Sequence, residues 1–217
     1  KPKKYSVDET KKILAKYKDD VDSVEDTSDL PNVLVIMNES FADLTMSYNL
    51  DLSDDPLEFY HELITRDNVV SGVMHSSQFG GGTANVEYEC ITQNVTAFLP
   101  SGSMPYQQYI SGNVKQSMVA YMNRLGYTTY GIHSWEKSGY SREKIYKLLG
   151  FDYAWFKENL GNLQFGRSGY SSDQSTYEVY YDIMNNKPDD EKNFSFIVTM
   201  QNHLPYNDVD PNGIQFL

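Results

Sequence analysis

The chain has 217 residues and a formal net charge of −12, with 18 lysines and arginines against 30 aspartates and glutamates. This acidic balance argues against a nucleic-acid-binding surface, because neutralising a phosphate backbone requires a surplus of basic side chains. A hydrophobic share of 40% and an aromatic share of 14% exclude a mainly disordered chain, and the single cysteine, Cys90, excludes an internal disulfide.

The N-terminal part, residues 1–29, is expected to form a short amphipathic helix and an acidic linker. Apolar residues recur at helical spacing within residues 6–21, with Ser6 or Asp8 available as the N-cap. The remainder of this part is polar and acidic and lacks periodicity, which is typical of a linker. We therefore expect the main domain to occupy residues 30–217.

Apolar runs alternate with amphipathic segments along the main domain. Runs of β-branched and other apolar residues predict three strands, at residues 33–37, 128–133 and 194–200. Apolar side chains at helical spacing predict helices at residues 114–125, 142–149 and 175–184. The first strand is expected to be buried on both faces, because its run contains no polar residue. The alternation predicts an α/β fold, with a mostly parallel sheet flanked by helices.

Polar side chains follow each predicted strand. Glu39 comes soon after the first strand, His133 ends the second and His203 follows the third. Ligands of parallel sheets bind beyond the carboxyl ends of the strands, so these residues are candidates for a site. Glu39 would offer oxygen ligands to a hard divalent cation, or it only caps a helix or pairs on the surface. Each histidine can bind phosphate oxygens or protonate a leaving group, or it is a structural residue.

A glycine-rich segment, Gly80–Gly82, precedes Thr83, where we expect a helix to begin. A hydroxyl at a helix N-terminus suits an oxygen nucleophile that attacks phosphorus, although Thr83 is equally well explained as an N-cap alone. The segment is not a nucleotide P-loop, since no Lys-Ser/Thr pair follows the glycines. Arg142 opens another predicted helix and is either a phosphate-binding guanidinium or an ordinary exposed arginine.

Four motifs in order resemble the lipoteichoic acid synthase family, in the sulfatase-like branch of the alkaline phosphatase superfamily. They lie at residues 31–44 (PNVLVIMNESFADL), 80–89 (GGGTANVEYE), 131–152 (with GIH, SREKIY and GFD) and 199–206 (TMQNHLPY). The resemblance covers about residues 30–206. It implies an alkaline phosphatase/sulfatase-like α/β domain of which this chain lacks the C-terminal part.

The resemblance implies a transferase at the extracellular face of a bacterial cell membrane, anchored by upstream transmembrane helices that this chain does not include. Such enzymes transfer phosphoglycerol from phosphatidylglycerol to a glycolipid or a teichoic-acid-type polymer through a phospho-threonine intermediate. The resemblance assigns Thr83 as the nucleophile, and Glu39 and Thr83 as ligands of a divalent metal, Mn²⁺ or Mg²⁺. The positions that it assigns to substrate binding are Arg142, His203, His133 and Tyr140.

Two departures from the family pattern bear on these assignments. Tyr140 stands where the family has a tryptophan that packs on the substrate. The family completes its metal site with an Asp-His pair, and no Asp-His dipeptide occurs in this sequence. The chain alone is therefore expected to be inactive, and unpaired sheet edges predict that it can dimerise.

Other functions on the same scaffold stay open from the sequence. They are a phosphodiesterase, a phosphoethanolamine transferase, a sulfuric ester hydrolase, and an inactive domain that binds a cell-envelope polymer. The sulfatase reading is weakened because the Cys/Ser-x-Pro-x-Arg sequence converted to formylglycine is absent. The inactive domain is disfavoured because a binding module would need neither Glu39 nor Thr83.

Overall fold

The computed structural model describes residues 6–16, 29–47, 52–166 and 169–204. Residues 1–31 and 32–217 form two compact units. The first unit contains helix α1, Val7–Ala15, whose N-cap is Ser6: its Oγ accepts a hydrogen bond from the Glu9 amide at 3.0 Å. The expected continuation of this helix over residues 17–21 lies outside the described residues.

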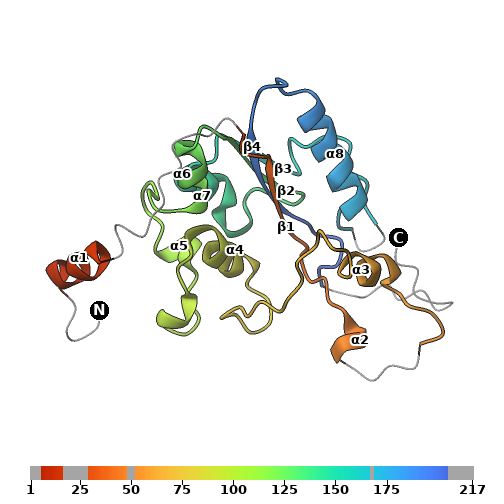
Figure 1. Ribbon diagram of the computed structural model, residues 1–217, viewed down its shortest axis with the longest axis horizontal. Helices are drawn as coiled ribbons and strands as arrows, with labels where there is room; N and C mark the ends of the chain where they lie inside the picture. Colours follow the sequence, from red (N-terminus) through yellow and green to blue (C-terminus); the bar gives the residue numbers. More distant parts are fainter. Residues whose placement is uncertain (1–5, 17–28, 48–51, 167–168, 205–217) are drawn as a thin grey trace. The chain divides into compact units, whose positions relative to one another are not determined.

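The second unit is built on a sheet of four parallel strands in the order β1-β4-β2-β3 (Figure 1). Their bounds are β1 Val33–Met37, β2 Thr128–His133, β3 Tyr153–Phe156 and β4 Asn193–Val198. The predicted α/β fold with a parallel sheet is confirmed. Val198 of β4 stands in register beside both Met37 and His133, so the carboxyl ends of the three strands lie at one edge of the sheet.

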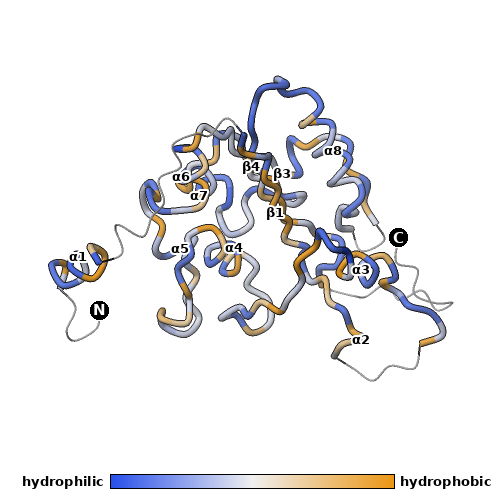
Figure 2. The backbone as a smooth tube through the Cα atoms, in the orientation of Figure 1, coloured by the Kyte–Doolittle hydropathy of each residue, from blue (hydrophilic) through white to orange (hydrophobic). Residues whose placement is uncertain are grey.

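Strand β1 lies at the edge of the described sheet, so the expectation that it is buried on both faces is wrong. Figure 2 shows the apolar residues that run along β1. Leu34 and Ile36 are 43% and 42% exposed, whereas every residue of β4 is buried. An apolar run indicates a strand of a parallel sheet, but it does not reveal whether that strand has one neighbour or two.

Helices cover both faces of the sheet. The longer ones are α4 Thr83–Thr92, α6 Met118–Arg124, α7 Arg142–Leu149 and α8 Asp173–Asn185, and the shorter ones are α2 Leu44–Ser47, α3 Glu58–Leu63 and α5 Pro105–Gln108. The three helices predicted after the first strand are present as α6, α7 and α8. Among the described helices, none combines the length and apolar character required to cross a membrane.

The two faces of β2 meet different helices. Ile132 joins a buried cluster with Val179 and Tyr180 of α8. Its neighbour Gly131 points to the opposite face, where a side chain would meet Tyr146 of α7. The sheet is thus held between α8 and α7, and this fixes the start of α7 near the carboxyl ends of the strands.

Candidate active site

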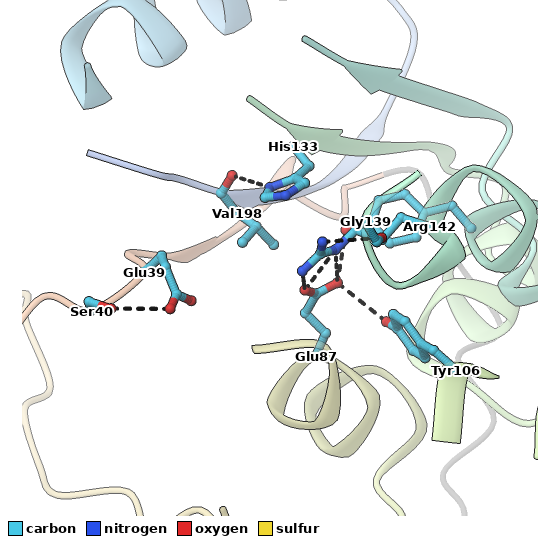
Figure 3. A network of polar contacts seen from close by, with 9 residues as sticks. Glu39, Ser40, Glu87, Tyr106, His133, Gly139, Arg142 and Val198 are labelled. Atoms are coloured by element: carbon cyan, nitrogen blue, oxygen red, sulfur yellow. Dashed lines mark hydrogen bonds and ion pairs between the residues drawn. The ribbon is translucent and has the colours of Figure 1, made fainter. Parts of the chain in front are cut away.

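Glu39 lies two residues beyond the end of β1 and is 8% exposed. Its amide donates to Thr199 Oγ1 at 3.3 Å, which ties it to the end of β4. Ser40, at φ 57°, donates from its hydroxyl to Glu39 Oε1 at 3.1 Å (Figure 3). No lysine, arginine or histidine within the described residues pairs with this carboxylate. A buried carboxylate without a cationic partner suits a bound metal cation.

Thr83 is the first residue of α4, as the sequence predicted. The three preceding glycines all have positive φ, and Gly82 at the N-cap has φ 77° and ψ 37°. Thr83 is 8% exposed, and its hydroxyl makes no hydrogen bond to any residue that the structure describes. The hydroxyl is therefore not engaged as a side-chain cap and stands beside the unpaired N–H groups of a helix N-terminus.

Arg142 is not the exposed arginine that the sequence left open, since it is 3% exposed and lies in a buried ion pair with Glu87. Its Nε donates to Glu87 Oε1 at 3.0 Å and Oε2 at 3.2 Å, and Nη2 also donates to Oε1. Burial alone would lower the pKa of Arg142, but the Glu87 carboxylate reverses this and raises it. The guanidinium of Arg142 therefore stays charged although it is buried.

Two residues in left-handed conformation lead into Arg142. Tyr140 has φ 53° and Ser141 has φ 61°, values that residues with a side chain adopt at a cost. This turn places the Tyr140 ring 5.1 Å from Arg142 Cζ. It also brings the Gly139 carbonyl within 3.4 Å of Nη1. Backbone strain of this kind is concentrated at functional sites.

His133 ends β2 and is 1% exposed. Burial, followed by the charges of Arg142 and His203, lowers its pKa to about 3, which places all three residues in one electrostatic neighbourhood. The ring is therefore neutral at neutral pH, and its Nδ1 lies 3.1 Å from the Val198 carbonyl, which can only accept. His133 thus donates through Nδ1 and keeps a lone pair on Nε2.

His203 is partly buried beyond the end of β4. Its amide donates to the Met200 carbonyl at 3.0 Å, and its ring lies 5.1 Å from the ring of Tyr170. The Tyr170 hydroxyl donates to the Leu204 carbonyl at 2.9 Å, which holds the chain on the far side of His203. His203 therefore has a defined place although it lies in a loop.

The predicted residues are joined through two sets of contacts. Glu39 is joined to β4 through Thr199, and His133 through Val198. Arg142 is joined through Glu87 to α4, the helix that begins at Thr83. Among the described residues, no group of three or more histidine, cysteine, aspartate or glutamate side chains is arranged to hold a metal ion. The metal-binding role of Glu39 and Thr83 stays a prediction.

Glu87 is the residue of this site that the sequence reasoning did not assign. It is fully buried and lies one helical turn after Thr83, so both side chains project from the same face of α4. The signal in the sequence was this spacing of four residues between a hydroxyl at a helix start and a carboxylate. Its partner lies 55 positions further along the chain, which the spacing does not reveal.

A family profile and one curated relative match this chain over most of its length. The sulfatase family profile matches residues 31–213. A Rhizobium meliloti (strain 1021) protein named "Putative cyclic beta-1,2-glucan modification protein" is 38% identical over 177 residues, which is 81% of this chain and 26% of that protein. The chain therefore spans about a quarter of the length of this curated relative.

Two solved structures show the same fold. The Streptococcus pyogenes phosphoglycerol transferase GacH, solved with sn-glycerol-1-phosphate, superposes with a TM-score of 0.78 and 24% identity over 100% of this chain and 59% of its own. The lipoteichoic acid synthase LtaP of Listeria monocytogenes superposes with a TM-score of 0.63 and 21% identity over 85% of this chain and 45% of its own. This chain belongs to the sulfatase family, and it shares its fold with GacH and LtaP.

Proposed function

We propose that the protein transfers phosphoglycerol from phosphatidylglycerol to a carbohydrate-containing acceptor at a membrane surface. The observation that carries the proposal is the connection of Thr83 to Arg142 through Glu87. One helix thus carries both a hydroxyl at its N-terminus, without a hydrogen bond to any described residue, and the carboxylate that pairs with a buried, charged guanidinium. Attack on a phosphodiester requires both elements, a nucleophilic oxygen and a cation that holds the phosphoryl oxygens.

In the first step, Thr83 Oγ attacks the phosphorus of the donor head group. A P–Oγ bond forms, the P–O bond to diacylglycerol breaks, and the proton from Thr83 ends on the released diacylglycerol. In the second step, an acceptor hydroxyl attacks the same phosphorus, and Thr83 leaves with the acceptor's proton. In both steps negative charge is carried by the phosphoryl oxygens, and the Arg142 guanidinium stabilises this charge.

The roles of the other site residues follow from their protonation states and positions. His133 is neutral and offers the Nε2 lone pair, so it accepts a hydrogen bond from a glycerol hydroxyl rather than donating a proton. His203 holds the glycerophosphate from the neighbouring strand end, and Tyr140 contacts it beside Arg142. Glu39 and Thr83 would supply two of the oxygen ligands of a divalent ion, which when bound would polarise the phosphoryl group as a Lewis acid.

The acceptor class follows from two different relatives. The fold shared with LtaP supports a glycolipid or a teichoic-acid-type polymer. The 38% identical relative, named for modification of a cyclic glucan, supports a glucan, and its identity is higher than that of either solved structure. We therefore propose that the acceptor offers a hydroxyl group of a glycolipid, a teichoic-acid-type polymer or a glucan, and that a glucan is tested beside the polymer.

The test is diacylglycerol release from phosphatidylglycerol vesicles by the full-length protein, with Mn²⁺ or Mg²⁺ added. Release by the native protein that is lost in Thr83→Ala, and kept in the surface control Thr65→Ala, supports the proposal. A mass increase of one glycerophosphoryl group on the peptide that contains Thr83 identifies the intermediate. Release that continues in Thr83→Ala would rule out Thr83 as the nucleophile.

The same assay separates the remaining activities of this scaffold. Free glycerol phosphate without acceptor modification indicates a phosphodiesterase, and turnover of phosphatidylethanolamine alone indicates a phosphoethanolamine transferase. Hydrolysis of an aryl sulfate indicates a sulfuric ester hydrolase. Polymer binding without turnover of any ester indicates an inactive binding domain, and each of these results would replace the proposal.

A further inference from the structure

We propose that Glu87 is a positioning residue, which aims the Arg142 guanidinium at the transferred phosphoryl group. The inference rests on the proposed function and adds to it a residue that contacts no substrate itself. Glu87 is fully buried, and Arg142 is 3% exposed, so water does not compete for their contacts. Figure 3 shows the carboxylate of Glu87 beside the guanidinium, with Tyr106 on its other side.

The hydrogen bonds from the Arg142 guanidinium to described residues engage some of its N–H groups and leave others for a substrate. A guanidinium carries five N–H groups. Glu87 accepts from Nε and Nη2, and the Gly139 carbonyl accepts from Nη1. Within the part of the chain that the structure describes, these hydrogen bonds leave one N–H on each of Nη1 and Nη2, and such a pair can hold two oxygens of one phosphate. Glu87 thus decides which edge of Arg142 is offered to the substrate.

The carboxylate of Glu87 is itself fixed by two buried tyrosines. The Tyr146 hydroxyl donates to Oε2 at 3.0 Å, and the Tyr106 hydroxyl donates to the same oxygen at 3.4 Å. Burial and then the Glu87 charge raise the pKa of both hydroxyls well above the usual value, so they stay protonated donors. These hydrogen bonds form one network: the two tyrosines fix the orientation of the Glu87 carboxylate, and Glu87 fixes the orientation of the Arg142 guanidinium.

The test is a double-mutant cycle in the full-length protein, with Glu87→Gln, Arg142→Gln and the double variant. The readouts are kcat/KM for diacylglycerol release and the inhibition constant of sn-glycerol 1-phosphate. If Glu87 acts through Arg142, Glu87→Gln lowers kcat/KM and weakens the inhibitor by about ten- to a hundredfold, and has no further effect once Arg142 is replaced. Glu143→Gln, which removes an exposed ion pair next to Arg142, is the matched control.

Two outcomes overturn the inference. Tighter inhibitor binding by Glu87→Gln would show that the carboxylate acts only as a repelling charge, because its removal would then help an anion to bind. An equal loss in the Arg142→Gln background would show that Glu87 acts independently of Arg142. Near-ultraviolet circular dichroism checks that each variant is folded.

A second variant covers the case in which Glu87→Gln does not fold. Tyr146→Phe removes one donor to Glu87 and keeps the ring, and it should weaken the inhibitor less than Glu87→Gln but in the same direction. An unchanged inhibition constant in a folded Tyr146→Phe protein would count against the network. Absence of inhibitor binding and of turnover in the native protein would instead reject the proposed function, and the inference with it.

Discussion

Gly131 and the ring of Tyr146 are in direct contact across the face of β2. A Cβ atom on Gly131 would lie 2.6 Å from Cδ2 of Tyr146 and 3.2 Å from Cδ2 of Phe151. Only a residue without a side chain allows α7 to approach the sheet so closely. The approach brings the Tyr146 hydroxyl to Glu87, so the packing of the sheet and the geometry of the site share one contact.

We expect Gly131→Ala to destabilise the protein by about 1–3 kcal/mol, because the added methyl group overpacks a buried site. The displaced Tyr146 ring should also loosen the Glu87 carboxylate and reduce turnover. Urea unfolding and diacylglycerol release measure the two effects. Gly72→Ala is the control, since nothing lies within 4 Å of a Cβ at that position. Equal stability of the two variants would contradict the expected contact.

Alanine substitutions at Gly82 and Gly81 distinguish the effect of backbone strain from the effect of a specific side-chain contact. Both have positive φ, so Ala at either position should cost about 1 kcal/mol of stability. Only at Gly82 would the Cβ approach a neighbour, 3.1 Å from Oε1 of Gln78, which accepts a hydrogen bond from Asn85 of α4. We expect both variants to lose similar stability and Gly82→Ala alone to lose activity. Equal activities would show that the start of α4 tolerates the contact.

A pH-dependent clamp joins the loop after β1 to α3. His61 Nε2 lies 2.8 Å from Asp43 and Nδ1 lies 2.6 Å from Asp55. The hydrogen bonds to Asp43 and Asp55, in that order of size, raise the pKa of His61 above 6.5. The hydrogen bonds from His61 and Thr45, in that order, lower the pKa of Asp43 to about 2. The imidazolium and both carboxylates are therefore charged together in mildly acidic solution.

The stabilisation by this clamp should be complete between about pH 4 and 6.5. It should be lost as pH rises through the raised pKa of His61, and also as pH falls towards about 2 and Asp43 is protonated. The measurement is the difference in unfolding free energy between the native protein and His61→Gln across this range. A difference that does not vary with pH would mean that the clamp carries no charge.

His133 should respond to pH in the opposite direction. Its pKa falls to about 3 in the folded protein, chiefly through burial, so the folded state binds fewer protons there than the unfolded state. Its contribution to stability is present above about pH 6.5 and is lost as pH falls. Proton NMR of the histidine rings should show no titration of His133 between about pH 5 and 8. A midpoint near 6.5 for His133 would contradict its burial.

Much of the fold was predictable because it depends on local pattern. The ranges 33–37, 128–133 and 142–149 coincide with β1, β2 and α7, since apolar runs and helical spacing are read directly from the chain. Strand β3 was missed because Tyr153–Phe156 is only four residues long and Tyr153 is 48% exposed. The edge position of β1 could not be predicted, because it depends on the order of strands and not on the strand itself.

The site was predictable where it follows strand ends and helix starts. Glu39, His133 and Thr83 could be singled out because a parallel sheet brings its carboxyl ends together and a glycine-rich turn precedes a helix. The ion pair of Glu87 with Arg142 required the tertiary fold, since its members come from two helices that no local pattern joins. The substrate-binding role of Arg142 is a prediction from the resemblance to a family, and the structure shows the contacts that hold this side chain.

The order of strands also determines when the site can form during synthesis. Glu39 is held by Thr199, which lies 160 positions later, and among the described strands β1 pairs only with β4. A nascent chain therefore leaves the backbone of β1 unpaired until β4 has left the ribosome and can pair with it. Contacts so distant in sequence form slowly, and the early chain is open to aggregation meanwhile. Chaperone demand should therefore be greatest before residue 199 emerges.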